Sequence, residues 1–335
     1  MRDPWLCLLL SVPAIQRGYT VKNKSESFPH PAGNSSARST QRISRVRISV
    51  HDLPIQKPAT TARAVEPLTK SVYALEHVRR MGGGSQPHLM RCSDGFYYVV
   101  KFQNNPQHSR TLVNELLGTL LAGWMGLPIA PFAVVDVGRD LIRSTEELVM
   151  KVGNSLTPCR EGLQFGSRYV CDPQESTVHS YLDDEQLKGI ENISDFLGML
   201  VFDKWTCNTD IRQTVFYKEN DHTGFLTRMI DQGYCFNAGE WDFRDRSFIG
   251  LFPQQSVYRF VRGLDSFGQW LEVLEDRITI TWLRNAAMQI PSAWYDSNMQ
   301  ALDGLIAQLD RRRMSVRKLI EEAKADFRRP FPNWT

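Results

Sequence analysis

Two patterns of apolar residues alternate along the chain from about residue 66, and the first of them predicts β-strands. The stretch LMRCSDGFYYVVKFQNN (89–105) carries β-branched and aromatic residues on both sides of a Ser-Asp-Gly turn, which is typical of a β-hairpin. It follows the glycine run of MGGGSQPHL (81–89). Further strands are predicted at FAVVDV (132–137), LVMKV (148–152) and LQFGSRYV (163–170). We expect these strands to form a small antiparallel sheet.

The second pattern predicts one long helix beside this sheet. Apolar residues of TLVNELLGTLLAGWMG (111–126) recur at helical spacing, and the only charged side chain among them is Glu115. A carboxylate on a helix that is apolar nearly all round is costly to bury without a cation. Lys101 lies among apolar residues of the strand 97–102 and is the expected partner, unless its stem reaches out to solvent. The pattern therefore predicts a buried Lys101–Glu115 ion pair.

The C-terminal half of the chain is predicted to be mainly helical. Helical patterns are found in ISDFLGMLVFDKW (193–205), SVYRFVRGL (256–264), FGQWLEVLEDRI (267–278), TWLRNAAMQI (281–290) and ALDGLIAQLDRRRMSVRKLIEEA (301–323). Two short strands, QTVFYK (213–218) and GFLTRMID (224–231), interrupt them. The polar stretch CDPQESTVHSYLDD (171–184) indicates a boundary between lobes. We expect an α+β fold with a leader (1–65), a small N-lobe (66–171) and a helical C-lobe (172–335).

Charge is distributed unevenly along the chain. The net charge is +3, but residues 1–50 carry eight Lys or Arg against Asp3 and Glu26, a local charge of +6, which leaves about −3 for the remainder. This balance argues against a body that binds nucleic acid in general. The basic leader is rich in Ser, Asn, Thr, Pro and Arg, a composition that predicts disorder.

Targeting signals and cysteines favour a cytoplasmic protein. The apolar run WLCLLLS (5–11) is short and Asp3 offsets Arg2, so a secretory signal at residues 1–14 is the less favoured alternative. No later stretch reaches the roughly 18 apolar residues of a membrane helix. The six cysteines form no CxxC pair, so neither a zinc knuckle nor a redox motif is indicated, and reduced, buried thiols are expected.

Several polar residues follow predicted elements in positions that suit phosphate chemistry. Gly82, Gly83 and Gly84 have no Cβ, so their backbone N–H groups can approach phosphate oxygens, although a loose turn is the common use of glycine. Asp210 follows a buried helix in NTDIRQ (208–213) and is placed to accept a proton from a hydroxyl, or to form an Asx-turn. Asp231 ends a strand before a glycine-containing turn, as a magnesium ligand often does.

Taken together, these segments resemble the HipA-like kinases, a bacterial branch of the protein-kinase-like fold, over about residues 70–335. The segments that carry the resemblance are GGSQPHL (83–89), YYVVKF (97–102), LVNELLG (112–118), VFDKWTCNTDIRQTVF (201–216), IDQGYCFNAGEWDF (230–243) and PFPNW (330–334). As a set they look like the smaller stand-alone group of that family. The resemblance implies a two-lobed kinase that uses ATP and Mg²⁺.

Carried over residue by residue, the resemblance implies a role for each candidate. Gly83, Gly84, Ser85 and Gln86 are expected to contact phosphates together with Lys101, and Glu115 is expected to position Lys101. Asp210 is the expected base and Asp231 the expected metal ligand. Ser85 is also an expected autophosphorylation site, or else a cap of the glycine turn.

The sequence departs from the family pattern at two places. His88 stands where the toxin-type loop usually has lysine, and NTDIRQ (208–213) lacks the His and Asn that normally accompany the Asp. Gln213 is a candidate second metal donor in place of that Asn. Arg212 is expected either to offset transition-state charge or to pair with a carboxylate. In NAGEWDF (237–243), Glu240, Trp241 and Phe243 suit a substrate-facing loop, but packing is the favoured role of the two rings.

The leading functional prediction is an ATP- and Mg²⁺-dependent kinase acting on a Ser or Thr hydroxyl of a protein. The altered loop around Asp210 supports a second interpretation, a regulatory pseudokinase that binds nucleotide without turnover. A third interpretation keeps the kinase but makes the acceptor a lipid or small-molecule hydroxyl, which the near-neutral body disfavours. The acceptor, the oligomeric state and an antitoxin-like partner stay open.

Overall fold

The computed structural model describes residues 72–170, 178–219 and 223–335 of the chain. All of them belong to one compact unit, Lys57–Thr335. The predictions of a leader over residues 1–65, of a signal at residues 1–14 and of a lobe boundary at residues 171–172 fall outside the described residues.

The first lobe is a sheet of five strands that closes on itself. Its strands are β1 (Val72–Arg80), β2 (His88–Cys92), β3 (Tyr97–Lys101), β4 (Phe132–Val137) and β7 (Gly162–Arg168). They pair antiparallel in the order β1–β2–β3–β7–β4. β4 then pairs with β1 in parallel. The predicted antiparallel pairing is confirmed for β2, β3, β4 and β7, but the strand predicted at 148–152 lies outside this sheet, in a separate hairpin.

Alternation along β3 gives this sheet two different faces. Tyr98 and Val100 are buried inside the closed sheet with Val135 and Val137 of β4. Val99 and Lys101, which alternate with these two residues along β3, therefore point to the opposite face. A second hairpin, β5 (Val149–Val152) and β6 (Ser155–Pro158), and the short helix α2 (Arg139–Ser144) complete the lobe.

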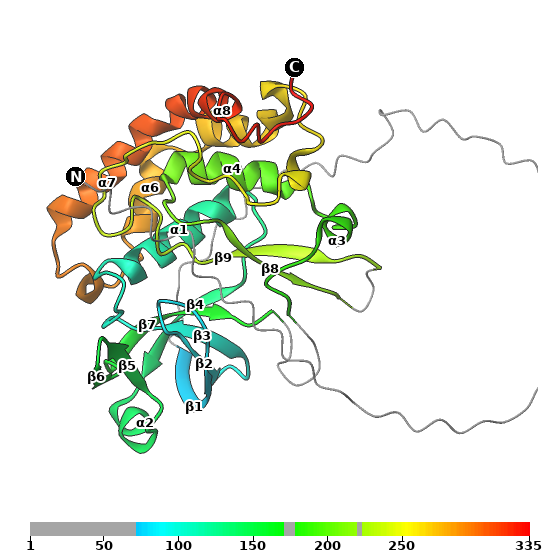
Figure 1. Cartoon of the computed structure of the whole chain (residues 1–335). Coiled ribbons are helices and arrows are strands. Elements are labelled where there is room, and N and C mark those ends of the chain that lie inside the picture. The colour runs from blue at the N-terminus through cyan, green and yellow to red at the C-terminus, as the bar shows by residue number, and fades with distance from the viewer. Residues whose placement is uncertain (1–71, 171–177, 220–222) are drawn as a thin grey trace, which may run out of the picture. The chain divides into compact units, whose positions relative to one another are not determined.

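The helix α1 (Thr111–Trp124) connects the two lobes. Every residue from Thr111 to Ala122 is buried, as its apolar surface all round requires. α1 packs against β7 on one side and against α4 (Asp195–Thr206) and α6 (Ile280–Ala287) on the other. Figure 1 shows α1 lying between the sheet and the helical lobe.

The second lobe is mainly helical, as predicted. Besides α4 and α6 it contains α3 (Asp184–Lys188), β8 (Gln213–Tyr217), β9 (Leu226–Ile230), α5 (Gly268–Glu272), α7 (Met299–Arg312) and α8 (Val316–Lys324). β8 and β9 form an antiparallel hairpin.

Two helix predictions were wrong in detail. The stretch 256–264 forms only the 3-10 turn Gln255–Tyr258, and Gly263, which takes a fully extended conformation, lies between it and the next turn. The stretch 301–323 is not one helix: a 3-10 turn at Arg313–Ser315 separates α7 from α8. This turn lets both helices bury their apolar faces, with Leu305 and Leu309 on one and Ile320 on the other.

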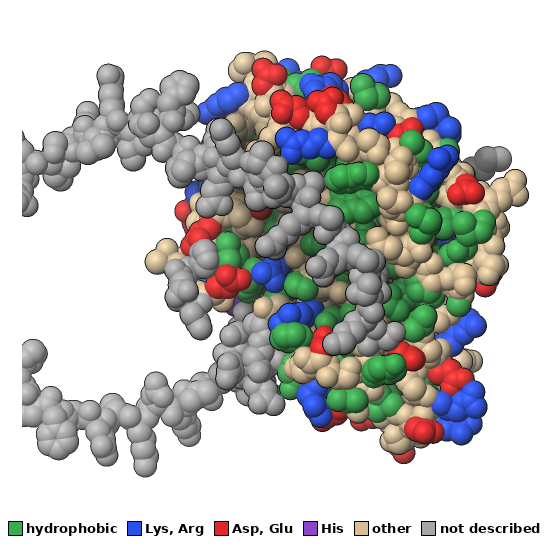
Figure 2. All heavy atoms as spheres, turned by 180° about the vertical axis from the view of Figure 1, so that it is seen from behind, with side chains coloured by type: hydrophobic (Ala, Val, Ile, Leu, Met, Phe, Trp, Pro, Cys, Tyr) green, Lys and Arg blue, Asp and Glu red, His purple; other side chains and the backbone are tan. Residues whose placement is uncertain are grey.

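The surface carries charges of both signs. On the face drawn in Figure 2, the acidic and basic side chains that are described lie interspersed and do not gather into one basic patch. Among the described residues, no helix is long and apolar enough to span a bilayer.

Close packing of α4 depends on a residue without a Cβ. A Cβ on Gly198 would lie 2.6 Å from Leu127 Cδ2 and would also overlap the indole of Trp270. Gly304, in contrast, is exposed on α7 and a Cβ there would meet nothing within 4 Å. Substitution by alanine should therefore have opposite effects on stability at the two positions.

We expect Gly198→Ala to lower the free energy of unfolding by about 2 kcal/mol through overpacking. Gly304→Ala should raise it by up to about 1 kcal/mol, since alanine favours an exposed helix. Urea unfolding monitored by circular dichroism measures both. Equal effects of the two substitutions would contradict the packing described for α4.

Candidate functional site

Three charged side chains meet where α1, β3 and the end of β9 come together. Lys101 of β3 forms a buried ion pair with Glu115 of α1, and its Nζ lies 2.8 Å from Asp231 Oδ1. The second oxygen of Glu115 accepts a hydrogen bond of 3.1 Å from the backbone N–H of Gln232. The predicted Lys101–Glu115 pair is present, and Asp231 joins it from the other lobe.

The electrostatics of this cluster favour one cation and two carboxylates. Burial by itself would lower the pKa of Lys101, but Asp231 and Glu115 outweigh it and raise the pKa. Burial raises the pKa of Glu115 against the pull of Lys101. The pKa of Asp231 is lowered because Lys101 outweighs burial. With both carboxylates ionised the cluster carries one net negative charge, which a divalent cation would neutralise.

The β8–β9 hairpin brings the two predicted metal donors to one place. Gln213 at the start of β8 pairs in register with Ile230, the residue before Asp231, and paired residues lie about 5 Å apart at Cα. Among the described residues, no group of three or more His, Cys, Asp or Glu could hold a metal. Mg²⁺ needs fewer, because it keeps waters and binds phosphates as well. A magnesium site on Asp231 and Gln213, completed by a nucleotide, stays a prediction.

The loop with Asp210 lies against the segment that follows Asp231. We name residues 231–243 the Asp231 segment. Thr209 donates a backbone hydrogen bond of 3.2 Å to Tyr234 O, and Phe236 donates one of 2.6 Å to Thr206 O. Asp210 and Asp231 both raise the pKa of Tyr234, for which burial is the larger cause. The predicted base Asp210 and the predicted metal ligand Asp231 thus both act on Tyr234, and their joint role in one site stays a prediction.

The Asp210 carboxylate is partly committed to its own loop. It accepts a hydrogen bond of 2.8 Å from Ile211 N and one of 3.3 Å from Gln213 Nε2. The first of these contacts is local, as in the alternative in which Asp210 stabilises a turn. Asp210 is nevertheless half-buried rather than fully enclosed.

Arg212 is buried behind this loop. Its guanidinium forms a two-pronged ion pair with Asp203 of α4 and donates 2.8 and 2.9 Å hydrogen bonds to Gln232 Oε1 and Ile230 O. These contacts favour the alternative in which Arg212 pairs with a nearby carboxylate. It then acts on the chemistry only by holding the Asp210 loop and the end of β9 together.

The glycine run forms the turn between β1 and β2. Within the described part of the chain, the N–H groups of Gly83, Gly84 and Ser85 donate no hydrogen bond, whereas Gln86 N bonds Gly83 O at 3.1 Å. Gly83 has a φ of +113°, a conformation that favours glycine. A turn with a row of free N–H groups fits the predicted phosphate cradle.

The side chains of Gln86 and Ser85, unlike the glycine N–H groups, are already bonded or buried. The amide of Gln86 bonds both backbone groups of Lys151 in β5, at 2.7 and 2.8 Å, and also receives Arg80. It therefore anchors the turn to the β5–β6 hairpin, and its contact with phosphate stays a prediction. Ser85 is buried, so its modification would require the turn to move.

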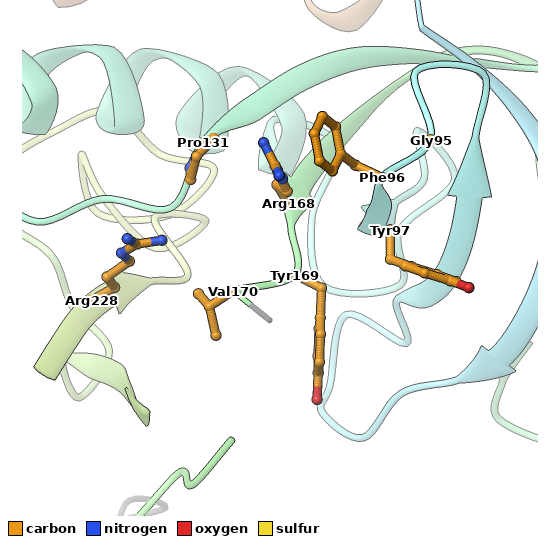
Figure 3. A pocket seen from close by; sticks show the side chains of 8 residues that line it. All are labelled: Gly95, Phe96, Tyr97, Pro131, Arg168, Tyr169, Val170 and Arg228. Atoms are coloured by element: carbon orange, nitrogen blue, oxygen red, sulfur yellow. The ribbon is translucent and has the colours of Figure 1, made fainter. Parts of the chain in front are cut away.

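A strip of half-buried residues continues from Lys101 along the same face of the sheet. Register pairs Val99 with Ser167, and Tyr169 N bonds Tyr97 O at 2.8 Å. Beyond this strip lies a pocket of about 520 Å³, lined by Gly95, Phe96, Tyr97, Pro131, Arg168, Tyr169, Val170 and Arg228. Figure 3 shows Arg228 entering it from the β9 side and Phe96 from the β2–β3 turn. The pocket contains none of the charged cluster residues.

Three polar residues of the site were missed in the sequence. Asn114, Asp203 and Gln232 are buried and connect α1, α4 and the Asp231 segment. Asp203 could have been found, because it is a carboxylate within the apolar run LGMLVFDKW (197–205), the same signal that singled out Glu115. Amides give no such signal, since they are common on helix surfaces.

The prediction that Trp241 and Phe243 pack into the body is confirmed. Trp241 is buried, and Phe243 lies half-buried against the core. The four cysteines within the described residues, Cys92, Cys159, Cys207 and Cys235, are buried and unpaired, as expected.

Comparison with known families finds one match, and it covers the candidate residues. The sequence profile of a family described as HipA-like kinase matches residues 75–237, a span that contains every candidate residue from Gly82 to Asp231. The resemblance read from the sequence is confirmed, and with it the two-lobed kinase-like fold. No curated protein sequence matches the chain.

Solved structures similar to this chain include two that are described as kinases. The Helicobacter pylori proinflammatory kinase CtkA is 13% identical, with 77% of this chain and 100% of that chain covered and a TM-score of 0.48. A Golgi casein kinase with Mn and ADP bound is 11% identical, with 76% and 73% covered and a TM-score of 0.44. Hydra Fam20 with sugar is 11% identical, with 76% and 85% covered and a TM-score of 0.40.

Lys101→Met tests the charged cluster. We expect it to lower the free energy of unfolding at pH 7.5 by about 3 kcal/mol, because Glu115 is left buried without its cation. The loss should shrink as the pH falls, since Glu115 can then take up a proton. Lys101→Met/Glu115→Gln should recover part of the loss, because the glutamine still accepts from Gln232 N. Urea unfolding that finds the double variant no more stable than Lys101→Met would contradict this account.

His88 gives the N-lobe a dependence on pH. It is fully buried, 3.0 Å from His77 Nε2, and burial, aided by His77 and Arg80, lowers its pKa to about 4. Between pH 6.5 and 4 the unfolded chain binds a proton that folded His88 does not, so stability is lost as the pH falls through this range. We expect a loss of up to about 3 kcal/mol.

Unfolding measured at intervals from pH 7 to 4.5 checks this expectation, with His88→Gln as the comparison. The variant should show a flatter profile, with a residual slope from His77, whose pKa burial also lowers. An identical slope in both proteins would show that His88 is not the group responsible.

Proposed function

We propose that this chain, which belongs to the HipA-like kinase family through residues 75–237, transfers the γ-phosphate of ATP to a Ser or Thr hydroxyl of a protein in a Mg²⁺-dependent reaction. The observation that carries the proposal is the meeting of Lys101, Glu115 and Asp231 between the two lobes. These residues come from three separate elements, and their convergence has no purely structural need, since an apolar core would be at least as stable.

The N-lobe would hold the nucleotide. Free N–H groups of Gly83, Gly84 and Ser85 would bind its phosphates, and Lys101, fixed by Glu115, would add a positive charge beside them. The strip of Val99 and Ser167 on the same face of the sheet provides a surface for the base. Gln86 would act indirectly, by holding the glycine turn in place.

The C-lobe would hold the metal and the acceptor. Mg²⁺ on Asp231 and Gln213 would offset charge on the phosphates. Asp210 would accept the proton of the attacking hydroxyl and orient that hydroxyl for in-line transfer. Arg212 keeps these two acids in a fixed relation through its bonds to Asp203 and Ile230 O. The work of the protein is therefore positioning and charge compensation.

A second candidate is a pseudokinase that binds nucleotide without transfer. It is favoured by the contact between Gln213 Nε2 and Asp210 Oδ2 at 3.3 Å, because an amide donor on the carboxylate makes it a weaker base. A cytoplasmic location, an antitoxin-like regulator and a lipid or small-molecule acceptor remain subordinate proposals.

Nucleotide binding is tested first. We expect ATP with Mg²⁺ to raise the melting temperature, by mass action on the folded state, by several degrees at about 100 times the dissociation constant. Lys101→Ala and Asp231→Ala should each reduce the shift, and Asp231→Ala should abolish its dependence on Mg²⁺. Gly304→Ala is the matched control, because it lies on exposed α7. If no nucleotide shifts the melting temperature, both the kinase and the pseudokinase are excluded.

Transfer is tested next, with γ-labelled ATP and either the chain itself or a mixture of proteins as acceptor. Wild-type protein should incorporate label on Ser or Thr, identified by mass spectrometry. Asp210→Asn should reduce transfer by about 10²-fold or more while nucleotide binding is kept. Binding without label on any protein, lipid or small molecule would leave only the pseudokinase.

A further inference from the structure

Asn114 of α1 is a heavily hydrogen-bonded side chain that neither the sequence nor the proposed chemistry singles out. It is fully buried. Its Nδ2 lies 2.8 Å from Gly233 O, 2.9 Å from Cys235 O and 2.8 Å from Ala238 O. Its Oδ1 accepts a hydrogen bond of 2.9 Å from Trp241 Nε1. Every one of these partners belongs to the Asp231 segment.

The Asp231 segment needs such support because its backbone is strained. Six residues of it other than glycine have a positive φ: Asp231, Phe236, Asn237, Ala238, Trp241 and Phe243. A side chain in this conformation costs free energy, and it persists only where surrounding contacts hold it. Asn114 binds the carbonyls of Gly233 and Cys235, which precede the positive-φ residues 236–238, and the carbonyl of Ala238, the last of these residues.

Asn114 and its neighbour Glu115 act on the same piece of chain. Glu115 accepts from Gln232 N, and the amide of Asn114 donates to Gly233 O. Two adjacent residues of α1 therefore hydrogen-bond the backbone directly after Asp231: Glu115 accepts and Asn114 donates. Because α1 is buried from Thr111 to Ala122, these two hydrogen bonds anchor the Asp231 segment to the core of the molecule.

The composition of the Asp231 segment limits one alternative way of ordering it. DQGYCFNAGEWDF contains no Ser or Thr, and its only hydroxyl is that of Tyr234. Kinases that order this part of the chain by phosphorylating it need an acceptor hydroxyl and an arginine to bind the phosphate. Here a neutral, buried amide supplies the ordering contacts instead.

We propose that Asn114 is a positioning residue that holds Asp231 in its metal-binding place, so that α1 and the Asp231 segment form one permanently assembled unit. The metal-binding part of this inference rests on the proposed function. Asn114 touches neither nucleotide nor acceptor and acts through the backbone of residues 233–238. Activity should therefore not require a separate activating modification of the segment.

Hydrogen exchange of the nucleotide-free protein tests directly whether Asn114 holds the Asp231 segment. We expect amides of residues 233–241 to exchange about tenfold faster in Asn114→Ala, because the segment opens locally more often. Trp241→Phe, which removes the indole N–H together with part of the ring, should show a smaller increase in the same peptide and covers the case in which Asn114→Ala does not fold. Thr119→Ala is the control, since Thr119 is a buried polar residue further along the same helix; it should leave this peptide unchanged.

The Mg²⁺ concentration that gives half of the stabilisation by ADP tests the consequence for Asp231. It should rise at least about fivefold in Asn114→Ala, whereas the affinity for ADP without metal should stay within about twofold. Unchanged exchange in Asn114→Ala and Trp241→Phe, or the same change in Thr119→Ala, would overturn the proposal. So would a parallel loss of metal-dependent and metal-independent binding. If wild-type protein shows no Mg²⁺-dependent response to ADP, the proposed function fails, while hydrogen exchange still decides whether Asn114 holds the segment.

Discussion

The structure depends on the burial of one carboxylate. Glu115 sits on a helix that is enclosed on all sides, so it must be paired or protonated. Lys101 satisfies the charge and Gln232 N satisfies the second oxygen. These partners come from β3 and from the chain after β9. Pairing the buried Glu115 carboxylate therefore fixes how the sheet, the central helix α1 and the second lobe pack together.

A second buried ion pair does the same for the loops of the C-lobe. Asp203 on α4 receives Arg212, and Asn208 Nδ2 donates to the same carboxylate at 3.0 Å. Arg212 in turn reaches Ile230 O and Gln232 Oε1. The loop with Asp210 and the strand that ends at Asp231 are thus tied to one helix. Neither pair is needed for stability, since apolar residues would pack as well, so their value lies in the geometry they impose.

Close backbone approaches complete the site, and they limit what each position can hold. A Cβ on Gly118 would come within 2.8 Å of Gln232 Cβ, and one on Gly233 within 3.1 Å of Glu115 Oε1. α1 and the Asp231 segment therefore touch almost backbone to backbone. This contact is what allows the short amide of Asn114 to reach three carbonyls.

The sequence by itself determined the elements and the charged partners. A lone Glu115 in an apolar helix and a Lys101 among strand residues were enough to predict their pairing, because burial of a charge is costly wherever it occurs. Strand and helix patterns likewise gave the two lobes, and the order of the motifs gave the family. Element ends such as the turn at Arg313–Ser315 were not predicted, since they depend on which faces find a core.

Only the tertiary structure decided what the polar side chains do. Arg212 was open between catalysis and pairing until Asp203 was found beside it, and Gln86 was expected at phosphate but holds Lys151. Asn114 gave no signal at all. An amide costs nothing on a surface and much in a core, so its role depends on partners far away in the chain, which no local pattern contains.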